Sequence, residues 1–168
     1  MTEPLSPSQT IGPLWGFALM FEGSAQAVDP SEPGALRLYG NVSDGLGPLG
    51  YPDSLLEVWH GEQWARTRPD EDGNYAVVVR KPPPLELPDG AGVQAPHLNL
   101  CVFARGLLKQ VITRVYFPDE AAANAADPVL ALVDPDDRET LVGTYDADGG
   151  LRFDVRIQGD RETVFFAL

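Results

Sequence analysis

Short alternating segments separated by Asp-Gly turns constrain the fold of this 168-residue chain more than any other feature. Alternation with a period of two is typical of strands that bury one face. Asp-Gly pairs favour tight turns, and Asp148-Gly149-Gly150, which lies between two such segments, predicts a hairpin. Strands are predicted at 36–42, 55–59, 75–79, 98–103, 111–117, 140–145, 151–157 and 163–166.

Helical signal is scarce. An acidic start followed by alanines at 119–124 predicts one short helix, and 129–133 is compatible with a second short turn. Residues 1–13 contain several Pro and Ser and predict an extended arm, whereas 14–168 predict one domain. The fold expected is therefore all-β: an antiparallel β-sandwich with one or two short helices and an extended N-terminal arm.

The charge balance narrows the range of partners. Twenty-five acidic and 12 basic side chains give a net charge of −13, which disfavours nucleic acid and anionic membranes. A small anionic substrate would need a locally placed cation. The one cysteine, Cys101, rules out an internal disulfide and predicts a buried, reduced thiol. The first residues lack the pattern of a signal peptide, and no segment has the length of a membrane helix, so a cytoplasmic location is expected.

One predicted strand carries an unusual polar face. The segment begins at an imidazole, ends at a guanidinium and is followed by Gly106, which lets the backbone turn away. One side holds Leu98, Leu100, Val102 and Ala104, and the other holds His97, Asn99, Cys101, Phe103 and Arg105.

The polar residues of this strand have two interpretations each. A guanidinium matches a carboxylate at two points, so Arg105 could bind an anion, or it could form an ion pair with one of the many acidic side chains. It is expected to be the only basic residue on the face shared with His97. His97 itself is either a hydrogen-bonded structural residue, with Asn99 as a possible partner, or a ligand.

A complete metal site is not favoured by residue type. The two histidines, His60 and His97, lie far apart in the sequence, and no Cys/His cluster with zinc spacing exists. The five tyrosines could bind ferric iron as phenolates, but no spacing gathers them.

Several segments, in order along nearly the whole chain, resemble the alpha subunits of the protocatechuate 3,4-dioxygenase family of intradiol ring-cleavage dioxygenases. They include Ser8-Gln9-Thr10-Ile11-Gly12-Pro13 and Ala95-Pro96-His97-Leu98-Asn99. Further matching segments are 56–59, 72–75, 103–106, 113–117, 124–130, 153–159 and 163–166.

The resemblance implies a two-chain enzyme of aromatic catabolism in the beta-ketoadipate pathway. An alpha and a beta subunit of the same sandwich fold pair, and these pairs assemble into a higher oligomer. The beta subunit holds ferric iron, Fe(III), through two tyrosines and two histidines. With O2, protocatechuate is opened between its hydroxyls to 3-carboxy-cis,cis-muconate, while the alpha subunit lines the substrate pocket.

The resemblance also assigns roles residue by residue. His97 matches the first histidine of the ligand pair and Asn99 the second, so neither metal ligation nor catalysis is expected from this chain alone. The segments 56–72 and 82–94 contain no counterpart of the two tyrosine ligands. The residues that match the substrate pocket are Thr10, Gly12, Pro13 and Arg105, with Arg105 near the substrate's carboxylate.

Two further classes stay open. The chain could be a non-catalytic β-sandwich module that binds a ligand or partner, or a homomeric assembly of alpha-type chains without its own activity. In the dioxygenase interpretation, the arm 1–13 and the apolar end 164–166 are expected to be buried against the partner. The loops after Trp59 and before Leu36 are short for the family.

Overall fold

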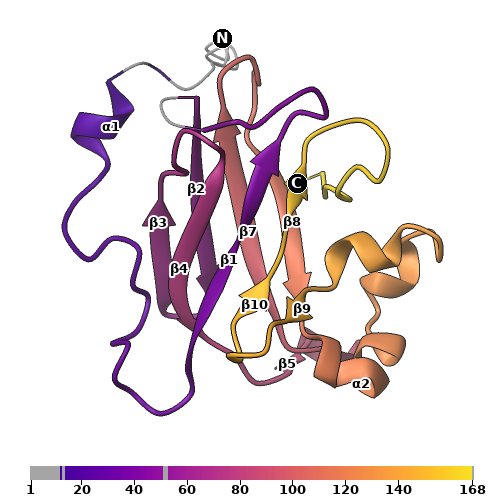
Figure 1. Ribbon diagram of the computed structural model, residues 1–168. Helices are drawn as coiled ribbons and strands as arrows, with labels where there is room; N and C mark the ends of the chain where they lie inside the picture. Colours follow the sequence, from indigo (N-terminus) through magenta and orange to yellow (C-terminus); the bar gives the residue numbers. More distant parts are fainter. Residues whose placement is uncertain (1–11, 13, 51–52, 168) are drawn as a thin grey trace, which may run out of the picture.

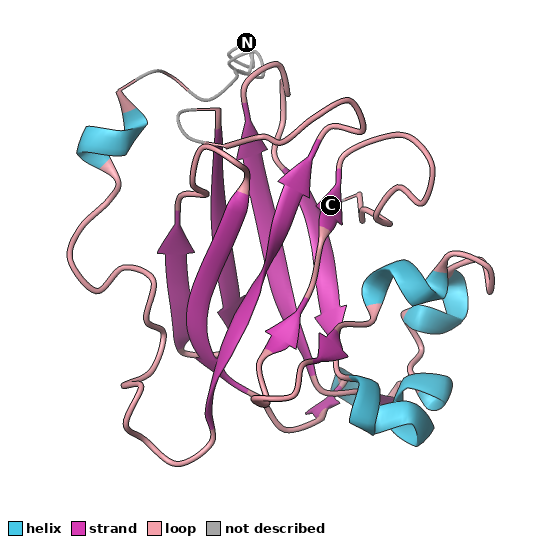
Figure 2. Cartoon of the chain, viewed as in Figure 1, coloured by secondary structure: helices cyan, strands magenta, loops and turns pink. Residues whose placement is uncertain are grey.

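The computed structural model describes residues 12, 14–50 and 53–167 of the chain, and these form two sheets packed face to face (Figure 1). Helices lie at the margins of the sandwich, as Figure 2 shows. The predicted β-sandwich is therefore confirmed. The predicted N-terminal arm, 1–13, lies outside the described residues except for Gly12.

The first sheet is mixed, so the prediction of an antiparallel sandwich is correct for the second sheet but not for this one. Its long strands β1 and β4 are antiparallel, whereas β10 and β11 both run parallel to β1. β9 and β10 pair antiparallel around Asp148-Gly149-Gly150, which confirms the predicted hairpin. The strands are β1 (Ala35–Ser43), β4 (Asn74–Arg80), β9 (Thr144–Tyr145), β10 (Leu151–Arg152) and β11 (Val155–Arg156).

The second sheet is antiparallel throughout, in the order β3-β2-β7-β8. Its strand β3 was not predicted, because Trp64 and Arg66 hide the alternation; Arg66 lies opposite Glu57 of β2 and forms an ion pair with it. The strands are β2 (Ser54–His60), β3 (Gln63–Thr67), β7 (His97–Ala104) and β8 (Val111–Tyr116), and a separate two-stranded ribbon is formed by β5 (Leu85–Glu86) and β6 (Val93–Gln94).

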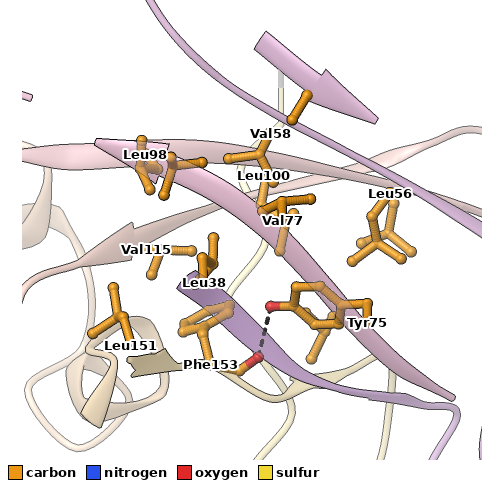
Figure 3. Packing of buried hydrophobic residues seen from close by; sticks show 14 of the residues in the cluster. Leu38, Leu56, Val58, Tyr75, Val77, Leu98, Leu100, Val115, Leu151 and Phe153 are labelled. Atoms are coloured by element: carbon orange, nitrogen blue, oxygen red, sulfur yellow. Dashed lines mark hydrogen bonds between the residues drawn. The ribbon is translucent and has the colours of Figure 1, made fainter. Parts of the chain in front are cut away.

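The core lies between the two sheets (Figure 3). Tyr75 is the one phenol in the main cluster of fully buried residues, and its hydroxyl donates to the Phe153 carbonyl at 2.7 Å. Gly40 is required beside it, because a Cβ there would lie 1.9 Å from the Phe153 oxygen. Residues labelled in Figure 3 are Leu38, Leu56, Val58, Tyr75, Val77, Leu98, Leu100, Val115, Leu151 and Phe153.

The helices are short, as expected. α2 forms at the predicted alanine run, and it covers a second apolar cluster with the 3₁₀ turns near it. The α-helices are α1 (Trp15–Ala18) and α2 (Ala121–Ala126), and the 3₁₀ helices are η1 (Pro88–Gly90), η2 (Pro118–Glu120), η3 (Leu130–Leu132) and η4 (Arg138–Leu141).

The C-terminal strand predictions were partly wrong. Residues 140–141 belong to η4, so only the end of the predicted strand 140–145 is extended. The strand 151–157 is interrupted at 153–154, where the Asp154 side chain, instead of the backbone, accepts the Asn41 N–H at 3.0 Å. Residues 163–166 form no strand, although the Phe166 N–H donates to the Ile112 carbonyl.

The apolar end of the chain packs on the domain itself. Val164, Phe165 and Phe166 are half-buried against the chain's own two clusters, and burial of their remaining surface against a partner stays a prediction. Cys101 is a buried free thiol, as predicted, and burial raises its pKa to about 12. Within the described residues, no helix combines the length and the apolar character that a membrane span requires.

Candidate functional site

Strand β7 positions both groups that the sequence singled out, at opposite ends. His97 is its first residue, and Arg105 follows its last, Ala104. At about 3.3 Å a residue, the two lie about 26 Å apart. The structure therefore does not bring them into one site, and each end has to be described on its own.

At the first end, His97 is buried and opposite Tyr116 of β8. Its Nδ1–H donates to the Ala95 carbonyl at 2.8 Å, so Nε2 carries the lone pair. Burial lowers the pKa of His97 to about 4, which keeps the ring neutral near pH 7. The predicted pairing of Asn99 with His97 is wrong: the Asn99 amide points to the Trp59 carbonyl, at 3.5 Å.

Tyr116 belongs to a network that sequence reasoning missed. Its ring centroid lies 5.6 Å from that of His97, and its hydroxyl donates to Asp127 at 3.3 Å. Arg114 donates to the Tyr116 hydroxyl at 3.3 Å and to Gln94 at 3.1 Å. Burial raises the pKa of Tyr116 to about 12, so the phenol stays protonated.

Asp127 ties this network to the backbone. It is fully buried and accepts the Ala95 N–H at 2.7 Å and the Val129 and Leu130 N–H groups at 2.8 Å each. These bonds connect the turn before β7 to η3. Asp127 is therefore a structural carboxylate, because every hydrogen bond that it accepts within the described part of the chain comes from a group of the chain itself.

His60 lies beside His97, with ring centroids 5.2 Å apart in an edge-on arrangement. Burial lowers its pKa as well, and its Nδ1 is buried without a hydrogen-bond partner among the described residues. The two histidines that are distant in sequence are thus neighbours, because β2 and β7 pair.

These residues do not fit a ferric iron. Within the described ranges, no three His, Cys, Asp or Glu side chains gather as a metal site would require. Asn99 offers an amide where the family pattern has an imidazole. Tyr116, the phenol nearest to His97, is protonated and already bonded to Asp127 and Arg114.

At the other end, Arg105 forms an ion pair with Asp53 in which Nη2 lies 3.0 Å from Oδ2. The Arg105 side chain is 74% exposed and that of Asp53 only 27%. Gly106 follows with φ +92°, a left-handed conformation that suits glycine and lets the chain turn. The ion-pair interpretation of Arg105 is therefore realised in this chain, on an open surface.

Arg105 is not the only basic residue on the face of the sheet that carries His97, contrary to prediction, because Arg114 of β8 lies on that face as well. Arg114 lies opposite Asn99 in the register of β7 and β8, and its charge lowers the pKa of His97. The period-two spacing of Arg114 and Tyr116 is a signal that could have placed them beside the His97 face. Gln94 and Asp127 gave no such local signal.

Of the residues predicted to line the substrate pocket from the N-terminal arm, only Gly12 is described. It is exposed, and its carbonyl accepts the Trp15 N–H at 3.3 Å at the start of α1. Thr10 and Pro13 lie outside the described residues. Phe17 of α1 and Leu14, the residue just before the helix, are 83% and 70% exposed.

The fold matches solved ring-cleavage dioxygenases. Hydroxyquinol 1,2-dioxygenase from Pseudomonas putida DLL-E4 aligns with a TM-score of 0.61 and 17% identity, over 88% of this chain and 65% of that one. Catechol 1,2-dioxygenase from Acinetobacter sp. ADP1 aligns with a TM-score of 0.59 and 19% identity, over 78% of this chain and 55% of that one. A dioxygenase domain from Streptomyces sp. SirexAA-E aligns with a TM-score of 0.53 and 19% identity, over 94% of this chain and 96% of that one. The fold is thus that of the intradiol dioxygenases.

Sequence comparison narrows this class. The protocatechuate 3,4-dioxygenase alpha chain of Pseudomonas putida is 38% identical over 196 aligned residues, covering 97% of this chain and 96% of that protein. The alpha chain of Burkholderia cepacia is 37% identical over 96% of each. No protein-family model matches. This chain belongs to the protocatechuate 3,4-dioxygenase alpha-chain family.

Proposed function

We propose that this chain is the non-iron-binding subunit of a two-chain dioxygenase that cleaves protocatechuate between its hydroxyls. Both oxygen atoms of O2 enter the product, 3-carboxy-cis,cis-muconate, so the reaction needs no external reductant. The observation that carries the proposal is the 38% identity to an alpha chain over 97% of this sequence. A beta subunit of the same fold is the partner proposed, in a higher alpha-beta oligomer.

Ferric iron is assigned to the beta subunit. Support comes from the donor set of this chain: beside the two neighbouring histidines lie only Asn99 and a protonated, hydrogen-bonded Tyr116, and no third His, Cys, Asp or Glu joins them within the described residues. When bound to the partner, iron supplies the activation of the catecholate towards O2. The residues of this chain would contribute only to binding and orienting the substrate.

Arg105 is the residue that we assign to the carboxylate of protocatechuate. It projects from the end of β7 on an exposed side chain, in a chain whose net charge is −13. A guanidinium there can meet a carboxylate held in the partner's pocket. Thr10, Gly12 and Pro13 are proposed to line the same pocket from the arm.

Expression of this chain with and without a beta-type partner tests the proposal. We expect ring cleavage of protocatechuate, and iron near one atom per pair of chains, only when both chains are present. A homomer that cleaves protocatechuate, or a two-chain complex that binds iron but leaves protocatechuate intact, would refute it. A cytoplasmic location is part of the proposal, and fractionation of the native host checks it.

A further inference from the structure

Arg105 and Asp53 contact each other through both their backbones and their side chains. Ser54 pairs with Ala104 in the register of β2 and β7, which brings Asp53 beside Arg105. The Arg105 N–H donates to the Asp53 carbonyl at 2.7 Å, so the backbone of Arg105 is fixed one residue beyond the end of β7. The side chains add an ion pair at 3.0 Å.

Asp53 is the better-fixed member of the pair. Its own N–H donates to the Gly50 carbonyl at 2.7 Å, and its side chain is 27% exposed against 74% for Arg105. Arginine has many rotamers, and an exposed one loses that freedom when it binds a ligand. A fixed carboxylate at its side reduces the freedom that has to be lost.

The geometry differs from that of a purely structural ion pair in the same sheet. Arg66 donates both Nε and Nη2 to Glu57, and both side chains are only 19% exposed. Asp53, in contrast, contacts Arg105 through Nη2, at the end of a side chain that projects into solvent. A guanidinium has five N–H donors, so the remaining edge can still meet a second carboxylate.

We infer that Asp53 is a positioning residue for substrate specificity: it holds the Arg105 guanidinium in the orientation in which it receives the carboxylate of the aromatic substrate. This inference rests on the proposed function of Arg105. Asp53 acts only through Arg105 and touches neither the ring nor the oxygen. Its effect is therefore confined to substrates that carry a carboxylate on the ring.

Steady-state kinetics of the two-chain enzyme tests this, with protocatechuate and with catechol, which lacks the carboxylate. For Asp53→Ala we expect KM for protocatechuate to rise about threefold to tenfold, with kcat within a factor of about two. KM for catechol stays unchanged. Asp53→Asn gives a smaller rise in the same direction, because the amide keeps a hydrogen-bond acceptor but not the charge.

A double-mutant cycle separates positioning from an independent effect. Asp53→Ala added to Arg105→Ala should change nothing further, because the group to be positioned is gone. Glu32→Ala is the matched control: it releases Arg80 from another exposed ion pair and should leave both KM values unchanged. Size-exclusion chromatography and melting curves check assembly, and Asp53→Asn carries the test if Asp53→Ala does not assemble.

The contrary outcomes are distinct. A lower KM for protocatechuate in Asp53→Ala would mean that Asp53 competes with the substrate, and an equal rise for catechol would mean a structural role. Either overturns the inference while leaving the role of Arg105 intact. If Arg105→Ala leaves KM and kcat for protocatechuate unchanged, the proposed role of Arg105 fails and this inference fails with it.

Discussion

The two ends of strand β7 differ in where their polar groups find partners. At the His97 end, the imidazole, phenol and carboxylate are buried and bonded to groups of the same chain. At the Arg105 end, the charged group has one carboxylate beside it and is mostly exposed. The same strand therefore carries one end whose imidazole, phenol and carboxylate are bonded within the chain, although the neighbouring His60 keeps an unpaired Nδ1 among the described residues, and one end that can accept an outside partner.

This difference separates structure from function within a single element. Polar groups that are buried must be paired, and removing a partner leaves an unsatisfied group whose cost falls on folding. An exposed ion pair contributes little to stability, so its removal affects chiefly what it binds. Variants at the two ends should consequently differ in the kind of measurement that detects them.

Asp127 gives the largest expected effect, on stability at the His97 end. Asp127→Ala removes the acceptor of three backbone N–H groups and of the Tyr116 hydroxyl, and should lower the free energy of unfolding by about 3–5 kcal/mol. Urea unfolding measures it. Asp134→Ala is the control, because that exposed carboxylate accepts only the Asp136 N–H among the described residues. A loss below about 1 kcal/mol would show that solvent replaces Asp127.

Arg105→Ala gives the next effect, on catalysis at the other end. We expect kcat/KM for protocatechuate to fall about 10- to 100-fold, since a hydrogen bond to a charged group contributes about 1.5–3 kcal/mol. The rate with catechol and the melting temperature should hardly change. Arg105→Lys should recover only part of the lost kcat/KM, because lysine keeps the positive charge but not the planar, two-pronged guanidinium.

The two ends of β7 would not differ in role if Arg105→Ala lowered the activity on both substrates equally, or prevented pairing with the beta subunit. Arg105 would then be an ordinary structural residue like those at the His97 end. Arg80→Ala is the matched control, because Arg80 also forms an exposed ion pair, with Glu32, and is assigned no substrate contact.

His97 predicts a smaller, pH-dependent effect on stability. Its folded pKa of about 4 lies below the usual value of 6.5 for an unfolded chain, because burial disfavours the charged ring. The unfolded state therefore binds the extra proton between these values, and stability falls as the pH drops through this window. From pH 7 to pH 5 we expect a loss of about 2 kcal/mol from this residue.

His97→Gln should flatten that slope, and urea unfolding at pH 7 and pH 5 measures it. The carboxyl groups whose pKa values are lowered, among them Asp70 and Asp146, titrate below this window and so interfere little. His60→Gln serves for comparison: its pKa is lowered in the same direction, on a less buried ring. An unchanged slope in His97→Gln would mean that His97 is protonated as readily when folded as when unfolded.

The fold was largely predictable from local sequence, because strands with one buried face leave a period-two pattern. The failures fall where pairing is decided at long range. Residues 163–166 alternate like a strand but reach β8 only at isolated bonds, such as the one from Phe166 to Ile112. β3 was missed for the opposite reason: it pairs along its whole length with β2, although Trp64 and Arg66 hide the alternation in its sequence.

The candidate site was predictable in its residue types but not in its neighbours. The alternation of the segment singled out His97 and Arg105, whereas the partners of His97 come from β8, β2 and the turn at Asp127. Such contacts depend on strand register and on residues that are distant in the sequence, for example the bond from Ala95 to Asp127, which is 32 positions away. The ion pair of Arg105 was anticipated as a type, but its partner Asp53 was not.

Asn99→His gives the smallest expected effect and tests whether the His97 end could regain a metal. The change would add a second imidazole two residues along, on the same face of β7. We expect no stoichiometric iron and no colour in the isolated chain, for the variant as for the parent. The nearest phenol, Tyr116, has a pKa of about 12 and is bonded to Asp127 and Arg114, so it resists becoming a phenolate ligand. Iron analysis and the visible spectrum decide this: a phenolate-to-iron charge-transfer band in either protein would show that the buried end is as open to a ligand as the Arg105 end.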